Sequence, residues 1–207
     1  MLSEDQITRN KEQFISLLKG VTREGSNIEG LINKLCSSDF FTAPASTKYH
    51  GAFKGGLCRH CLDVYIVLKN MVMANNLDIN EESLIICALM HDFSKMNLYE
   101  NTYTNKKVYS ESGSKSDNAG RFDWVSEPGY KTVSVDERFV YGNHEETSEF
   151  MIRQFIPLNV EESVAILYHH GGMGYDSTKA DISLIYSRYP LALMLHLADM
   201  TCAYLYC

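Results

Sequence analysis

The sequence predicts an all-α domain, a helical bundle interrupted by a β-hairpin excursion around residues 100–140. Two observations predict the bundle: apolar residues recur at helical spacing in most segments, and capping signals precede several of these segments. A third observation sets off the excursion, because the helical pattern breaks there and a Ser/Gly/Asp-rich stretch covers residues 110–120. At 207 residues, the chain is expected to form one domain over residues 1–207, with helices in residues 1–38.

Four helices are predicted in the first half of the chain. Ser3 can cap the first, and residues 26–29 form a capping box for the second. The third helix covers residues 60–73, where apolar side chains spaced by three and four residues form one buried face. Asn80 caps the fourth, whose apolar run ends in the segment 88–95.

The second half begins with the excursion and then returns to helix. Short strands are expected at residues 107–109 and 130–133, around the Ser/Gly/Asp-rich segment, as parts of a flap insertion over residues 100–140. Whether this flap is a substrate lid or a decorated loop is left open by the pattern. Helical spacing resumes at residues 142–155, Asn159 caps the next helix, and Pro190 opens the last.

Composition limits the classes of partner. The chain is 45% hydrophobic, as in a globular protein, and its net charge of −7 offers no basic footprint for duplex nucleic acid. No apolar run is long enough to span a bilayer, so the protein is not expected to interact with a membrane. The N-terminus is polar and acidic and does not resemble a signal peptide, so a cytoplasmic location is expected. The six cysteines contain only one C-x-x-C, Cys58 to Cys61, which favours reduced, mostly buried thiols over a zinc knuckle.

The most informative stretch is the dipeptide His91-Asp92 at the end of the apolar fourth helix. Burying a carboxylate beside an imidazole costs several kcal/mol unless something compensates, and a divalent cation takes both groups as ligands. Adjacent helical residues point about 100° apart, but both can turn toward one ion where the helix ends. The alternative is an ordinary His-Asp pair on the surface at a helix terminus. Further ligands that converge on this dipeptide would distinguish a metal site from that alternative.

Further candidate ligands occur at helix ends and inside the last helix. A single histidine at a helix end is more often a capping or packed residue than a ligand. An aspartate embedded in the apolar last helix, however, must have a partner, and all of these positions being coincidental is the least expected outcome. The further candidates are His60, His144, His169, His170 and Asp199.

The order His…His-Asp…His…His-His…Asp resembles the HD superfamily of metal-dependent phosphohydrolases. Within it, the chain is similar to the HD portion of bacterial 3′-to-5′ exoribonucleases and to compact HD proteins of bacteria and their phages. The resemblance runs from about residue 40 to the C-terminus and implies an HD-domain helical bundle. The matching pieces are Tyr49-His50-Gly51, Gly55-Gly56-Leu57-Cys58-Arg59-His60, residues 88–95, Gly142-Asn143-His144-Glu145, His169-His170-Gly171 and His196-Leu197-Ala198-Asp199.

The resemblance also implies the ligand set. A first divalent transition metal would be held by four residues: His60, His91, Asp92 and Asp199. Asp92 would bridge to a second ion, held by His144 and by His169 or His170. Nitrogen and oxygen ligands with a bridging carboxylate suit Mn, Fe, Zn, Co or Ni, and the sequence does not choose among them.

The implied reaction is hydrolysis of a phosphate ester of a nucleotide or oligonucleotide by a hydroxide that bridges the two metals, with Asp92, Lys95 and His196 as catalytic residues. Lys95 would hold a phosphate oxygen; its alternative is a solvent lysine that offsets the helix dipole. His196 would orient Asp199 or donate a proton, and His50 could take either role or only stack in its loop. Cations are expected near the entrance at Lys48, Lys54, Arg59 and Arg188.

Two other functions stay open. The same ligands could hold two irons for an oxygenase reaction, which ranks lower because of Lys95, or the domain could bind a nucleotide without turnover. The expected partner is a phosphorylated small molecule or nucleotide. Oligomeric state and the identity of the substrate are not determined by the sequence.

Overall fold

The computed structural model describes residues 2–171 and 181–206. The all-α prediction is wrong: 51% of the described residues are helical and 14% lie in strands, so this is a mixed α/β protein in which helices dominate. The helical elements are α1 (Glu4–Leu18), α2 (Ile28–Cys36), α3 (Gly56–Ala74), α4 (Glu81–Met90), η1 (Phe93–Lys95), η2 (Val135–Glu137), α5 (His144–Arg153), α6 (Val160–Leu167), α7 (Ile182–Arg188) and α8 (Pro190–Leu205).

Most helix starts follow the capping signals. The side chain of Ser3 accepts a hydrogen bond from the Gln6 amide at the start of α1, and Asn80 and Asn159 cap α4 and α6 as predicted. The cap of α2 is Asn27, one residue after the start of the predicted box at residues 26–29. Local hydrogen bonding therefore sets these boundaries, as the sequence indicated.

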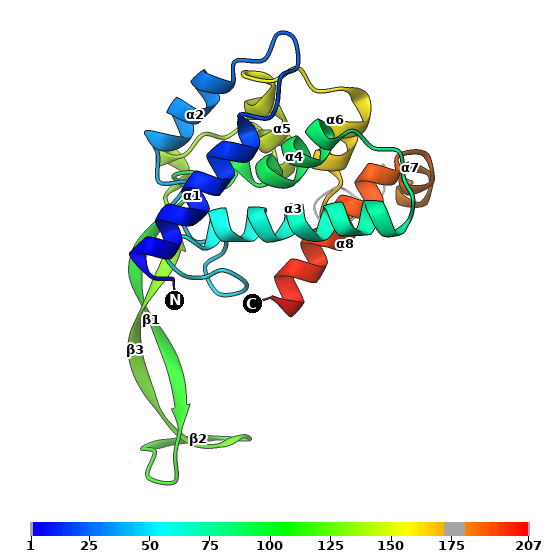
Figure 1. Ribbon diagram of the computed structural model, residues 1–207. Helices are drawn as coiled ribbons and strands as arrows, with labels where there is room; N and C mark the ends of the chain where they lie inside the picture. The colour runs from blue at the N-terminus through cyan, green and yellow to red at the C-terminus, as the bar shows by residue number, and fades with distance from the viewer. Residues whose placement is uncertain (1, 172–180, 207) are drawn as a thin grey trace.

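The strands form one antiparallel sheet in the order β1-β3-β2. They are β1 (Tyr99–Tyr109), β2 (Lys115–Asp117) and β3 (Gly120–Thr132). β1 pairs with β3 along its whole length, from Tyr99 opposite Thr132 to Tyr109 opposite Phe122. Figure 1 shows this ribbon projecting from the helical body. The excursion is therefore a long ribbon rather than a hairpin of short strands.

Side-chain alternation explains why the strands are this long. One face of the ribbon carries aromatic side chains, among them Tyr103, Tyr109 and Trp124. The opposite face carries cross-strand ion pairs, such as Lys131 Nζ to Glu100 Oε1 at 3.0 Å. An alternation of period two with favourable cross-strand pairs stabilises a strand along its whole length. The sequence predicted a β-hairpin here but made its strands too short, because the alternation of period two over residues 99–109 and 120–132 was not followed.

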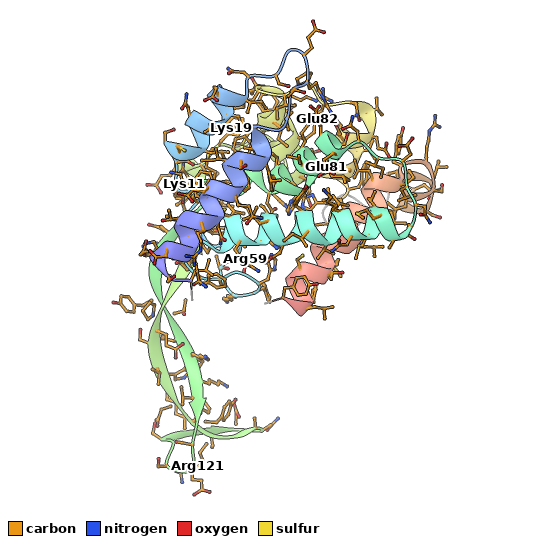
Figure 2. All side chains as sticks on the ribbon, viewed as in Figure 1. Lys11, Lys19, Arg59, Glu81, Glu82 and Arg121 are labelled. Atoms are coloured by element: carbon orange, nitrogen blue, oxygen red, sulfur yellow. The ribbon has the colours of Figure 1, made fainter. Side chains whose placement is uncertain are left out.

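The core lies where α3 packs against α4 and α8. Residues 83–90 of α4 are all buried, so this helix runs through the interior and ends among other side chains instead of at the surface. Charged side chains cover the outside, and Figure 2 labels examples on the helical body, such as Lys11 and Glu82, and Arg121 on the ribbon. Burial of α4 thus carries the His91-Asp92 dipeptide into the protein.

Two further findings concern the composition. None of the helices in the described part of the chain combines the length and the apolar character that a membrane span requires. Five cysteines are described as free thiols, of which four are buried and Cys36 is exposed. Cys207 lies outside the described residues.

Candidate metal centre

Five structural elements bring the predicted ligands together. His60 lies near the start of α3, His91 is the C-cap of α4, and Asp92 follows it before η1. His144 is the first residue of α5, and Asp199 lies inside α8. The pair His169-His170 follows the end of α6. All seven predicted metal ligands therefore belong to one region, although they are spread over 140 positions of sequence.

The first cluster contains His60, His91 and Asp199, all buried. The Nε2 atoms of His60 and His91 are 3.3 Å apart. Asp199 Oδ1 lies 3.0 Å from His60 Nε2 and 3.9 Å from His91 Nε2. These three ligand atoms converge closely enough that one ion could be held among them.

The second cluster contains His144, His169 and His170, with ligand atoms within 4.8 Å of one another. Both members of the His-His pair take part. His169 is fully buried, whereas His170 is partly exposed and its Nε2 lies 3.4 Å from Asp199 Oδ2. The sequence predicted that either His169 or His170 is a ligand, and the structure brings both of them to the cluster.

Asp92 lies between the clusters and presents one oxygen to each. Its Oδ2 is 3.4 Å from His91 Nε2 and 3.8 Å from His60 Nε2. Its Oδ1 is 3.8 Å from the Nε2 atoms of both His144 and His169. A carboxylate in this position can ligate two ions at once, which neutralises part of their mutual repulsion.

Backbone contacts determine which histidine nitrogens can act as ligands. His91 Nδ1 donates to the Ala88 carbonyl at 2.9 Å, and His169 Nδ1 donates to the Ile166 carbonyl at 2.7 Å. A carbonyl oxygen only accepts, so each Nδ1 carries the proton and each neutral ring has its lone pair at Nε2. The lone pairs of both rings therefore face Asp92 and the clusters.

Glu145 is the functional residue that the sequence analysis missed. It is buried, with Oε1 3.0 Å from His170 Nδ1 and Oε2 3.0 Å from His144 Nδ1. It therefore orients two histidines of the second cluster at once, as carboxylates behind metal ligands do. Acidic residues are favoured in the first turn of any helix, and its neighbour Glu146 serves only as a cap, so position alone did not distinguish the two.

Unpaired buried atoms test whether an ion fits. Asp92 Oδ1, His144 Nε2 and His169 Nε2 are buried and have no hydrogen-bond partner among the described residues. An orphaned buried polar atom is costly, and here three of them, all electron-pair donors, face one another. A divalent cation satisfies such a set. The buried His/Asp clusters could thus hold a metal ion.

The electrostatics keep the carboxylates ionised. Burial by itself raises the pKa of Asp92, but Lys95 and His91 outweigh burial and hold that pKa well below its usual range. Burial also raises the pKa of Asp199, and hydrogen bonds from His170 and His60 outweigh it in the same way. Both carboxylates therefore carry the negative charge that a dication requires.

The two neighbouring histidines of the pair differ in protonation. Burial, together with the nearby His91 and His170, holds the pKa of His169 well below its usual range, so this ring is neutral. Burial also lowers the pKa of His170, but hydrogen bonds to Asp199 and Glu145 outweigh it and raise that pKa to about 10. Without an ion, His170 is a cation between two carboxylates, and it must lose a proton to become a ligand.

Lys95 is a buried residue in η1, so the alternative of a solvent lysine is wrong. Its Nζ lies 2.7 Å from Asp92 Oδ2. Burial lowers the pKa of Lys95, but Asp92 outweighs burial and raises it. The lysine is therefore charged, and it supplies one positive charge to the centre.

His196 and His50 lie at the edge of the centre. His196 Nδ1 contacts the His169 carbonyl oxygen at 2.7 Å, and no hydrogen bond between His196 and Asp199 occurs among the described residues. The ring of His50 lies 4.7 Å from that of His60. His196 thus supports the backbone that carries His169, and His50 packs on a first-cluster ligand.

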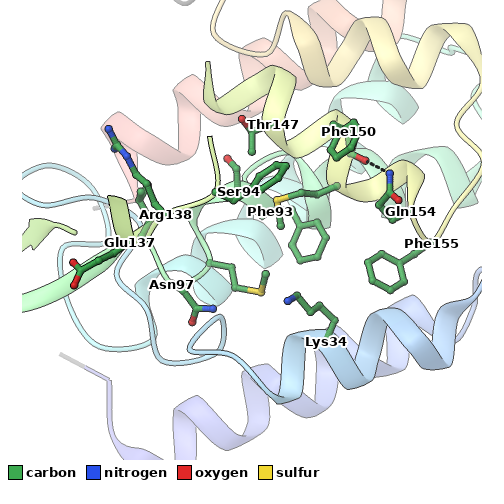
Figure 3. Close-up of a pocket in the computed structure, with 14 residues that line it drawn as sticks. Lys34, Phe93, Ser94, Asn97, Glu137, Arg138, Thr147, Phe150, Gln154 and Phe155 are labelled. Carbon is green, nitrogen blue, oxygen red and sulfur yellow. Dashed lines mark hydrogen bonds between the residues drawn. The ribbon is translucent and has the colours of Figure 1, made fainter. Parts of the chain in front are cut away.

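Besides two small cavities that reach His60 and His144, two larger ones lie near the centre. One, of about 700 Å³, is lined by His144, His170 and Asp199 and opens onto both clusters. None of the four expected entrance cations lines it: Lys54 pairs with Glu4, and Arg59 pairs with Asp63. The other, of about 430 Å³, contains no cluster residue. Figure 3 shows Phe93, Phe150 and Phe155 around it.

The likeness to the HD superfamily stays a prediction, because it rests on the order of the motifs and not on a comparison of whole chains. No protein-family model, curated protein or solved structure matches this chain.

Proposed function

We propose that this protein is an HD-type, metal-dependent phosphohydrolase that acts on a phosphate ester of a nucleotide or oligonucleotide. The position of Asp92 is the observation that supports the proposal most directly. Its two oxygens face two separate ligand clusters, one of which contains orphaned donor atoms. Paired metal sites that share a carboxylate are suited to displacement at phosphorus, where charge must be neutralised on several oxygens.

Bound divalent ions would lower the pKa of water and neutralise charge on the phosphate oxygens. The identity of the ions is a choice among Mn, Fe, Zn, Co and Ni that the donor set alone does not make. The residues of the chain supply the rest: Asp92 holds both clusters in one frame, and Glu145 fixes the orientation of His144 and His170.

Lys95 has two electrostatic roles in this proposal. As a buried ammonium beside Asp92, it offsets a carboxylate that would otherwise be costly to bury. It also adds positive charge on the side of the Asp92 oxygen that faces the first cluster, where a developing negative charge would be stabilised. His196 would act through His169, whose backbone it contacts.

The experiment is metal analysis followed by assays of phosphate esters with several metals. The wild type should retain about two ions per chain. The variants His144→Ala and His169→Ala should each retain one ion, held by His60, His91, Asp92 and Asp199, and lose at least about 100-fold in kcat. Near-normal turnover in both variants would refute the two-metal mechanism.

The same preparation separates the rival functions. Coloured iron with O₂ uptake and no ester hydrolysis would establish an oxygenase, and nucleotide binding without turnover under every metal would establish a sensor. Either result replaces the phosphohydrolase proposal.

A further inference from the structure

The cavity above the metal centre limits what can react there, because any substrate must occupy it. Its volume of about 700 Å³ is in the range of pockets that take a small molecule of nucleotide size. The residues that line it are Tyr49, His50, Asn143, His144, Glu145, His170, Asp199, Met200, Ala203 and Tyr204.

Two tyrosines give this cavity an aromatic mouth. Tyr49 is 82% exposed and Tyr204 is 75% exposed, although both line the cavity. They come from separate segments, the loop before α3 and the last turn of α8, which lie on the same side of the body in Figure 1. A single exposed tyrosine needs no explanation. Two open aromatic rings on one cavity form a surface on which a flat, partly polar group can stack.

The loop holds Tyr49 in place before any ligand arrives. The Tyr49 amide donates to Ser46 Oγ at 2.8 Å, and this hydroxyl donates to the His50 carbonyl at 2.9 Å. The base of the loop is closed by the Ala45 amide, which donates to the Gly51 carbonyl at 2.9 Å. Tyr204 is held by the α8 backbone. Because both backbones are already ordered, stacking on these rings requires only the two side chains, and not the backbone, to lose conformational entropy.

The charges select for a single phosphate. Among the described residues, no lysine or arginine lines the cavity, and the buried Lys95 already pairs with Asp92. Two divalent ions would bring four positive charges. The three buried carboxylates of the centre cancel three of these, Lys95 restores one, and the hydroxide that bridges the ions cancels one more, which leaves about one. A phosphate monoester carries close to two negative charges at neutral pH and exceeds this by about one, whereas a triphosphate brings about two further negative charges that no described cation of the cavity offsets.

We propose that the cavity takes a nucleoside monophosphate, with its phosphate at the two clusters and its base against Tyr49 and Tyr204. This inference rests on the proposed function and narrows its substrate class. In the reaction, the P–O bond to the nucleoside breaks, water supplies a hydroxyl to phosphorus and a proton to the leaving oxygen, and nucleoside and inorganic phosphate are released. Tyr49 and Tyr204 are specificity residues, because they contact the base and not the reacting atoms.

Kinetics with matched esters test the proposal. AMP carries a base, and ribose 5-phosphate carries the same phosphate without one. Tyr49→Ala and Tyr204→Ala should each raise KM for AMP by about tenfold or more and leave KM for ribose 5-phosphate unchanged. Tyr103→Ala is the control, because Tyr103 is also 75% exposed but lies on the ribbon. Kcat/KM for ATP should be at least about 100-fold below that for AMP.

Equal effects of the tyrosine variants on both esters, or turnover of ATP as fast as AMP, would overturn the inference. A binding experiment keeps it testable even if no ester is hydrolysed, which would remove only the proposed function. Adenosine, which has no phosphate, should give saturation-transfer NMR signals with the metal-free protein, and the double variant Tyr49→Ala/Tyr204→Ala should abolish them. Signals of equal strength in wild type and double variant, or none in either, refute the aromatic site.

Discussion

Glu145→Gln is the most sensitive test of how the second cluster is built. The glutamate accepts a hydrogen bond from His170 Nδ1 at 3.0 Å, and its other oxygen, Oε2, lies 3.0 Å from His144 Nδ1 in an ion-pair contact. Glutamine has the same shape, but only one of its two terminal atoms is an acceptor. Its amide nitrogen can only donate, so the histidine that faces it must carry its proton on Nε2. A protonated Nε2 has no lone pair for a metal.

The size of the effect follows from this exchange. One of the two contacts between the charged carboxylate and a histidine is lost, and a hydrogen bond to a charged group contributes about 1.5–3 kcal/mol. Since about 1.4 kcal/mol corresponds to a factor of ten in an equilibrium constant, the second ion should bind about 10- to 100-fold more weakly. Replacing carboxylates behind metal ligands typically has an effect of this size. The first cluster does not contact Glu145 directly and should change much less.

Metal titration by calorimetry, with the two binding steps resolved, measures this effect. Glu149→Gln is the control, because Glu149 lies on the same helix and pairs with Arg153 near the surface. A second-ion affinity for Glu145→Gln within threefold of wild type would refute the argument. So would equal weakening of both ions, since Glu145 would then act on the whole fold and not on the orientation of two ligands.

Two more predictions follow from the centre. Asp92→Asn should retain neither ion, because the bridging charge is lost, and elemental analysis that still finds two ions would contradict the bridge. The pKa of His170 in the metal-free protein is raised to about 10 from an ordinary value near 6.5, so protonation of His170 stabilises the folded state. That contribution is complete below about pH 6.5 and is lost as the pH rises toward 10. The Tm of EDTA-treated wild type should therefore fall over this range relative to His170→Ala, and parallel Tm curves would show that His170 is not protonated.

The sequence determined most of the helical frame and the membership of the centre. Caps such as Ser3, Asn80 and Asn159 act within a few residues, so local pattern suffices to place the starts of helices. His91-Asp92 at the end of an apolar run and Asp199 inside another could not be buried without a partner. That requirement predicts that these residues lie close together, but it does not predict the geometry of their contacts.

Only the tertiary structure determined which side chains contact one another in the metal centre. Glu145 contacts His170, which lies 25 positions further along the chain, and Lys95 pairs with Asp92 because η1 folds back into the interior. Both His169 and His170 reach the second cluster because the helical turn opens after α6, so a strict angle of about 100° between neighbours no longer applies. The long ribbon likewise depends on cross-strand pairing of β1 with β3. Contacts between distant segments depend on the packing of whole elements, and local periodicity carries no information about that packing.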